Sequence, residues 1–136
     1  MTTWHRLARV AGIVLGGAGL LVAFWNQLAF PSADGLLGGL SWLVVGVAPV
    51  YGVSVWVVCR RPEHPQARRL LLMGSSLAVN VALEGLIREA ADRYGTGGWL
   101  WLPNLAYQYS GVLSTIAGIL LIASYPDGVV ERTWQR

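Results

Sequence analysis

The chain has 136 residues, of which 54% are hydrophobic and only 12% are charged. Because soluble domains carry about a quarter charged residues, this composition excludes an ordinary soluble domain. The ten arginines give a net charge of +3 and lie at the ends of apolar segments, a placement that excludes nucleic acid as a partner. The single cysteine, Cys59, excludes an internal disulfide and a cysteine-based metal site.

Two apolar segments in the first half of the chain predict the first two membrane helices. The first covers residues 7–30 and contains an uncharged run, 10–25, with no convincing cleavage site after it. We therefore expect a retained helix and not a signal peptide. The second covers residues 36–58 and is uncharged throughout. Pro49 lies inside it, where the missing backbone N–H is expected to kink the helix.

Two further segments in the second half predict the other two membrane helices. The third covers residues 70–87 and is expected to continue as helix beyond the membrane to Arg93. The fourth covers residues 104–124, begins near Pro103, which suits a first helical turn, and ends before Pro126. The whole chain is therefore expected to form one all-α domain, a four-helix transmembrane bundle.

The positions of the arginines predict how the bundle is oriented. Short loops rich in arginine stay on the cytoplasmic side of a membrane. Both termini and the middle loop are therefore expected in the cytoplasm, with the lipid bilayer of a bacterial plasma membrane as the main partner. On the expected inner side lie Arg6, Arg9, Arg60, Arg61, Arg68, Arg69, Arg132 and Arg136, and on the outer side only Arg88 and Arg93.

Small residues at helical spacing indicate where the helices pack. Faces of this kind let two helices approach closely in a bilayer. We favour packing within one chain, and a homodimer is the alternative. The faces consist of Gly12 and Gly16 in the first segment and of Ser110, Ser114 and Gly118 in the fourth.

The third segment carries a line of polar residues at membrane depth: Ser76, Asn80, Glu84 and Arg88. Their spacing of four is expected to stack them on one helical face. Two interpretations stay open. In the structural one, which we favour, Glu84 pairs with Arg88 and the other two hydrogen-bond across helices. In the functional one, the carboxylate opens onto an outward cavity and titrates or binds a cation.

An aromatic group precedes and begins the fourth segment. It could line an outward pocket for an apolar or aromatic ligand, but an interfacial belt is the favoured interpretation. The group consists of Trp99, Trp101, Tyr107 and Tyr109. Since the sequence holds no phosphate-binding loop, no metal-spaced cluster and no nucleophile beside a base, we expect no catalytic residue, no metal and no cofactor, and we do not expect an enzyme.

Two short stretches flank the last two segments. The run RRPEHPQARRLLL at residues 60–72 resembles the loop between membrane helices in actinobacterial sensor histidine kinases. The run YPDG at residues 125–128 resembles the segment that leaves the last membrane helix in that family. The sequence departs from the family at Tyr125, where phenylalanine is usual, and at Val129, where arginine is usual. The resemblance covers most of the chain in layout, but its diagnostic residues number about a dozen.

The resemblance implies the membrane input module of a two-component histidine kinase. Such a module would relay a membrane or extracellular signal through the fourth helix and the linker Pro126, Asp127 and Gly128 to a cytoplasmic output. The sequence stops at Arg136, before the phosphorylated histidine and ATP-binding domain of that family, so the implied partner is a kinase domain in cis, and a stand-alone relative is the alternative. The rival functions are a small transporter or channel, with Asn80 and Glu84 as its polar site, and an accessory membrane subunit.

Overall fold

The computed structural model of the protein describes residues 3–31 and 35–124. Within these residues every regular element is a helix, and four stretches are long and apolar enough to cross a membrane. The predicted all-α four-helix bundle is therefore confirmed, while its orientation in the membrane stays a prediction. The four stretches are Thr3–Ala29, Gly35–Arg60, Pro65–Tyr94 and Gly98–Ala123.

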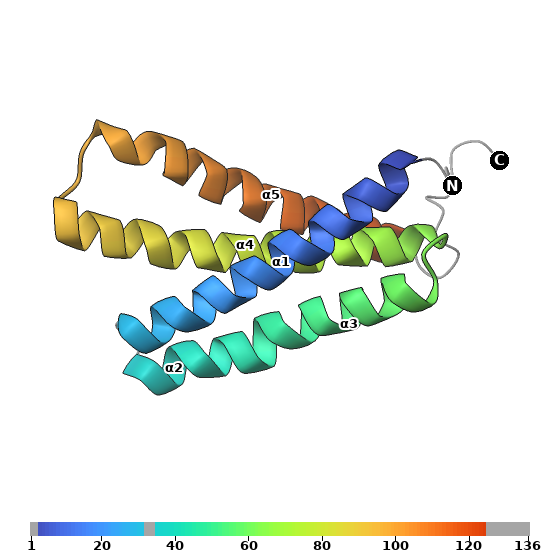
Figure 1. The fold of residues 1–136 in the computed structure, drawn as a ribbon, viewed down its shortest axis with the longest axis horizontal. Helices are drawn as coiled ribbons and strands as arrows, with labels where there is room; N and C mark the ends of the chain where they lie inside the picture. Colours follow the sequence, from blue (N-terminus) through green and yellow to red (C-terminus); the bar gives the residue numbers. More distant parts are fainter. Residues whose placement is uncertain (1–2, 32–34, 125–136) are drawn as a thin grey trace.

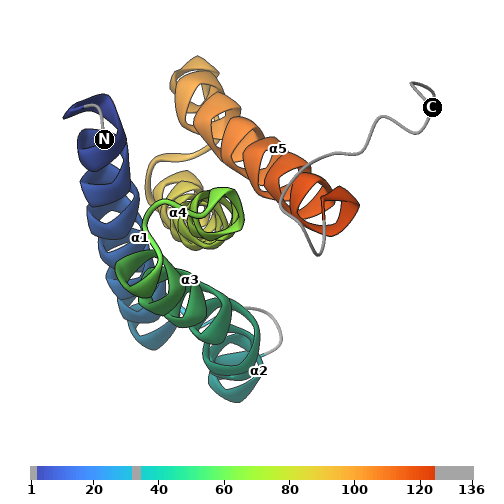
Figure 2. The same ribbon diagram turned by 90° about the vertical axis from the view of Figure 1, so that its right-hand side faces the viewer.

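The bundle is organised around one central helix, α4 (Pro65–Tyr94). Helix α1 (Thr3–Ala29) crosses it, and α3 (Ala48–Arg60) packs on the same side (Figures 1 and 2). Helix α5 (Trp101–Ala123) lies on the other side and makes no comparable contact with α1 or α3. The start of α1 and the end of α5 lie at the same end of the bundle (Figure 1).

The second membrane segment consists of three consecutive helices. These are α2 (Gly35–Ser41), the π-helix η1 (Trp42–Val47) and α3. Pro49 lies in the first turn of α3, and the N–H of Ala48 donates to the carbonyl of Leu43, five residues back. The predicted disturbance at Pro49 thus takes the form of a widened turn just before it, which accommodates a ring that would clash with an α-helical carbonyl.

Helix α4 is longer than the predicted membrane segment 70–87. It begins after His64, whose Nδ1 accepts a hydrogen bond from the N–H of Gln66 at 3.2 Å, with Pro65 in the first turn. It ends at Gly95, whose φ of 74° belongs to the left-handed region that favours glycine. Its 30 residues span roughly 45 Å, more than the roughly 30 Å of a bilayer core.

The last helix starts three residues before the predicted boundary at 104. A 3₁₀ turn, η2 (Gly98–Leu100), leads directly into Trp101, so Pro103 occupies the third helical position. A proline is tolerated in this first turn of an α-helix, where its fixed φ is already helical.

The interior of the bundle is rich in alanine beside a few larger residues such as Val47, and its outer surface carries many large apolar side chains. Ala23, Ala78 and Ala82 are buried in the main core cluster. In contrast, Leu37 is 82% exposed and Ile122 is 78% exposed. Such a surface would promote aggregation in water, whereas a bilayer covers it with lipid chains. The four helices and this surface together indicate a membrane protein.

Candidate functional site

The structure does not keep the four polar residues of the third segment on one face. Each turn of an α-helix takes about 3.6 residues, so a spacing of four advances by roughly 40° beyond a full turn. Over the twelve residues from Ser76 to Arg88 this drift reaches roughly 120°. The predicted polar line is therefore a spiral, whose members face different neighbours.

Asn80 faces α5. Its Nδ2 donates to the backbone carbonyl of Tyr107 at 2.8 Å and to the Oγ of Ser110 at 3.1 Å. Ser76 is buried, but its hydroxyl donates to the carbonyl of Leu72 in its own helix at 2.6 Å. Of the two cross-helix hydrogen bonds in the structural interpretation, only that of Asn80 is therefore formed.

Glu84 and Arg88 line a pocket of about 230 Å³ on the side of α4 that faces α1, α2 and η1. Glu84 lies ten residues before Tyr94, roughly 15 Å from the end of α4. This depth places the carboxylate inside the apolar layer when α4 spans the membrane. The remaining lining residues are Ala23, Asn26, Gln27, Gly38, Gly39, Trp42, Leu43, Val81 and Gly85.

The two opposite charges of the pocket are not paired with each other. Within residues 3–31 and 35–124, no ion pair within 4.0 Å involves Glu84 or Arg88. The expected Glu84–Arg88 pair is therefore wrong: both side chains line the same pocket, with their charged ends apart. The neighbouring Arg93 differs, because it pairs with Glu89 at 2.9 Å and lies over the ring of Phe30.

A buried amide, that of Asn26, adds a third polar group to the wall of this pocket. Asn26 is only 3% exposed, and its Nδ2 donates to the carbonyl of Ala82 at 3.3 Å. Its Oδ1 has no hydrogen-bond partner among the described residues. Gly85 makes room for this amide, because a Cβ there would lie 2.7 Å from Nδ2. An acceptor buried without a partner costs about 1–3 kcal/mol.

These groups suit a small ligand that carries both signs of charge. Glu84 could hold a cationic group and Arg88 an anionic one, and their Cβ atoms lie roughly 5–6 Å apart at this spacing. The indole of Trp42 from η1 supplies an aromatic wall. The pocket also adjoins the π-helix, and such irregular turns occur frequently at functional sites.

The predicted small-residue faces both lie against α4. A Cβ on Gly12 would come within 3.1 Å of Leu71, and one on Gly16 within 2.9 Å of Ser75. On α5, Ser110 is buried and Ser114 donates to the carbonyl of Met73 at 3.3 Å. A Cβ on Gly118 would lie 3.3 Å from the sulfur of Met73. The structure thus places both faces at contacts within one chain.

The four aromatic residues do not form one pocket. Trp99 lines an apolar pocket against Leu83 and Ile87 and packs edge-on against Tyr94, with 6.3 Å between ring centroids. Tyr107 lines a separate groove beside Asn80. The remaining two side chains, Trp101 and Tyr109, are exposed on α5. On α5, Tyr107 lies six positions after Trp101 and two before Tyr109, and residues at these spacings point in different directions from the helix axis.

A second polar contact lies at the opposite end of α4, where α4 begins and α5 ends. The Nε2 of Gln66 donates to the backbone carbonyl of Ser124 at 2.8 Å and to its Oγ at 3.1 Å. Arg69 also donates to the Oγ of Ser124. Ser124 is 1% exposed, so these bonds form in a covered site. They tie the end of α5 to α4 directly before Tyr125, while the predicted linker Pro126, Asp127 and Gly128 lies outside the described residues.

Several of these residues were missed in the sequence analysis. Asn26 and Gln27 are adjacent amides at the end of an apolar segment, and that position was the available signal for a polar wall. Gln66 lies in the run that resembles sensor kinases, but nothing in the sequence pairs it with Ser124. Among the described residues, no group of three or more His, Cys, Asp or Glu side chains is arranged to hold a metal ion.

Comparison of the chain with protein-family models, curated proteins and solved structures gives no significant match. The fold and the pocket therefore provide the basis for the functional proposal, together with the resemblance of two short segments.

Proposed function

We propose that the chain is a membrane-embedded input module that relays a membrane or extracellular signal through its last helix to a cytoplasmic output. The observation that carries this proposal is the layout of α4. One end of α4 carries the pocket with Glu84 and Arg88, and the other end is bonded through Gln66 and Arg69 to the end of α5. A single helix thus joins a candidate receiving site to the segment that leads into the linker.

The proposed relay uses two states of the α4–α5 contact. A signal can shift such an equilibrium only by interacting differently with the two states. A ligand or a change in the bilayer that draws Glu84 and Arg88 together would alter how η1 packs against this side of α4. The change would reach Ser124 as a shift of α5 along or around α4, the kind of small helix displacement that switching proteins use.

The orientation that this relay requires is part of the proposal. With both termini in the cytoplasm, the Glu84 pocket faces the outer half of the membrane and Ser124 faces the inner side. Reporter fusions at residue 136 and in the 95–98 loop test it. We expect a cytoplasmic reporter to be active at 136 and an exported reporter to be active in the loop, and the reverse pattern would contradict the proposal. A kinase domain in cis and a second copy of the chain are the partners that a sensor of this kind would use.

The functional test fuses a histidine-kinase core after Arg136 and measures autophosphorylation in liposomes. We expect Glu84→Gln to change the autophosphorylation rate by about fivefold or more, since coupling energies of about 1–3 kcal/mol are typical. Asp92→Asn is the matched control, because it removes one carboxylate from the same end of α4 outside the pocket. Equal rates in Glu84→Gln, Asp92→Asn and the unchanged fusion, across lipid compositions, would refute the relay.

A transporter is the second candidate, and the unpaired carboxylate of Glu84 at membrane depth favours it. Liposomes loaded with a cation- or zwitterion-sensitive dye separate the two functions. Flux that depends on Glu84 in the chain without any fused kinase would support transport. No flux combined with a kinase response would support the input module.

A further inference from the structure

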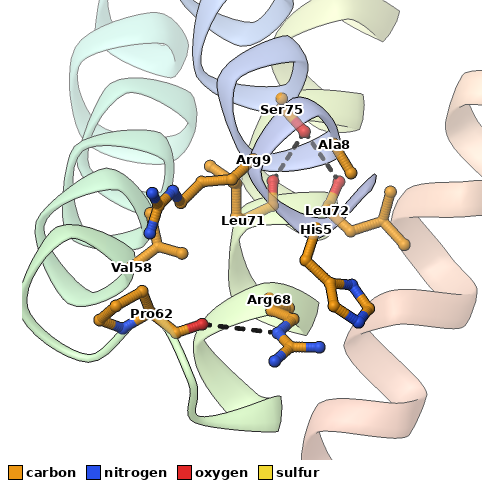
Figure 3. Close-up of a pocket in the computed structure, with 10 residues that line it drawn as sticks. His5, Ala8, Arg9, Val58, Pro62, Arg68, Leu71, Leu72 and Ser75 are labelled. Carbon is orange, nitrogen blue, oxygen red and sulfur yellow. Dashed lines mark hydrogen bonds between the residues drawn. The ribbon is translucent and has the colours of Figure 1, made fainter. Parts of the chain in front are cut away.

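A second pocket lies near the start of α4, where α1, α3 and α4 meet, and it differs in charge from the first. Its volume is about 150 Å³. Figure 3 shows Arg9 reaching from α1 towards Val58 of α3, while Arg68 and His5 lie across the pocket from it. All three side chains that can carry charge in this lining are basic. The others are Ala8, Gly12, Val58, Pro62, Leu71, Leu72 and Ser75.

Arg9 has no counter-charge in this pocket. It is partly buried, and it makes no ion pair or hydrogen bond with any described residue. Other arginines nearby are engaged, because Arg60 lies over the ring of Trp56 and Arg69 bonds to Ser124. An arginine held beside an apolar wall without a partner is a binding group for an anion.

Arg68 is only weakly committed to other groups. Its Nε lies 3.5 Å from the carbonyl of Pro62 and its Nη2 lies 3.4 Å from the carbonyl of Glu63, while its ion pair with the Glu63 carboxylate measures 3.7 Å between exposed side chains. Exposed pairs of this kind contribute about 0–1 kcal/mol, so a doubly or singly charged ligand can compete for the guanidinium. The pocket therefore offers two guanidinium groups from two different helices.

The rest of the lining indicates that the anion belongs to an amphiphile. Leu71 and Val58 form the buried wall, whereas Leu72 is 45% exposed and continues onto the outer surface of the bundle. A ligand with its charged group between the arginines can therefore extend an apolar chain along that surface. A free inorganic anion would leave this apolar part of the pocket unused.

We propose that this pocket binds the phosphate group of an anionic phospholipid. The planar forks of Arg9 and Arg68 match phosphate oxygens, and basic pockets between helices at the cytoplasmic end of a bundle recognise anionic headgroups. The site is independent of the proposed relay, because none of its lining residues belongs to the Glu84 pocket or to the contact of Gln66 and Arg69 with Ser124. It would anchor α1 and α4 to one lipid molecule at their basic ends.

The test measures lipid retention by native mass spectrometry of the full chain, released from detergent with equal amounts of phosphatidylglycerol and phosphatidylcholine. We expect one phosphatidylglycerol to be retained in preference to phosphatidylcholine. Arg9→Gln and Arg68→Gln should each weaken its binding about tenfold, as expected for charge-assisted hydrogen bonds. Arg6→Gln is the matched control, since it removes the same charge from α1 outside the pocket and should weaken binding at most about fivefold.

Two results would overturn the proposal. If Arg6→Gln and Arg9→Gln lower the affinity for phosphatidylglycerol equally, the lipid is attracted by the basic surface as a whole and there is no specific site. Displacement of the lipid by an equal concentration of inorganic phosphate would show a site for a soluble anion. Circular dichroism checks the helix content of each variant. Arg9→Lys keeps the charge but loses the planar guanidinium group, so it should bind the lipid with intermediate affinity. If Arg9→Gln fails to fold, Arg68→Gln decides by the same criteria.

Discussion

The two sides of α4 are held in different ways. On the α1 side, glycines bring the two helices together until backbone meets backbone, as at Gly19, where a Cβ would lie 3.0 Å from the carbonyl of Ala78. On the α5 side, polar side chains bridge the helices at separate points, from Asn80 in the middle to Gln66 at the end. Both contacts also bury small residues, Ala78 on the α1 side and Ala117 on the α5 side, but backbone lies within 3.0 Å of a Cβ only on the α1 side, at Gly19, whereas most of the hydrogen bonds are on the α5 side.

This difference indicates which contact is permanent and which can change. A close-packed helix pair has no second arrangement of similar energy, because any shift brings backbone atoms into collision. Hydrogen bonds between membrane helices contribute only about 0.6 kcal/mol on average, since the polar groups find other partners. We therefore expect α1, α3 and α4 to form the scaffold and α5 to be the element that moves. Substitutions on each side can test this.

The largest effect is expected from Gly19→Leu on the α1 side. The added side chain meets the backbone at Ala78 and Val79, which cannot rotate away. Overpacking of this kind should lower the free energy of unfolding by about 3 kcal/mol. Unfolding in mixed micelles, followed by circular dichroism, measures it. Gly52→Leu is the control, because nothing lies within 4 Å of a Cβ there, and similar losses in both variants would contradict close packing at Gly19.

An intermediate effect is expected from Asn80→Ala on the α5 side. This change removes the bonds to Tyr107 and Ser110, and it should lower the free energy of unfolding by about 1 kcal/mol. The same unfolding experiment applies, with the exposed Asn104→Ala as control. A loss as large as that of Gly19→Leu would show that the α5 contact belongs to the scaffold after all.

The smallest change in stability is expected from Gln66→Leu. It removes both bonds to Ser124, but it also removes an Oε1 atom that is buried without a partner, so the two effects offset to within about 0.5 kcal/mol. In the kinase fusion, the same change should abolish the effect of Glu84→Gln on autophosphorylation. Gln108→Leu on the exposed part of α5 is the control. An undiminished Glu84→Gln effect in the Gln66→Leu background would exclude Ser124 as the route to the output.

The spans could be predicted because each depends on local composition. An uncharged run such as 10–25 has no alternative to a buried or lipid-covered helix, whatever its neighbours are. Pro49 signalled a disturbance in the second segment, but whether it would kink the helix or widen it to a π-turn depended on its packing. Pro65 in the first turn of α4 and Gly95 at its end are boundary signals that can be recognised in the sequence, whereas the cap formed by His64 is not.

The candidate site was predictable only in part. Glu84 and Arg88 stand out in the sequence as charges at membrane depth, but their spacing of four suggested a mutual pair and one shared face. The drift of an α-helix over twelve residues separates Ser76 from Arg88, and neighbouring helices then decide what each side chain meets. Asn26 completes the Glu84 pocket from a helix that lies almost sixty residues earlier in the chain, which no local pattern reveals.

By itself, the sequence determined that this protein is made of four apolar helices, because a continuous apolar run of this length can satisfy its backbone hydrogen bonds within itself only as a helix. The distribution of arginine also predicts which ends face the cytoplasm. Only the tertiary structure decided that α4 lies at the centre, that α5 packs on it through small residues and several polar bonds, and that two pockets of different charge lie towards its opposite ends. These features depend on which helix faces come together, and small residues permit several such pairings until the whole bundle packs.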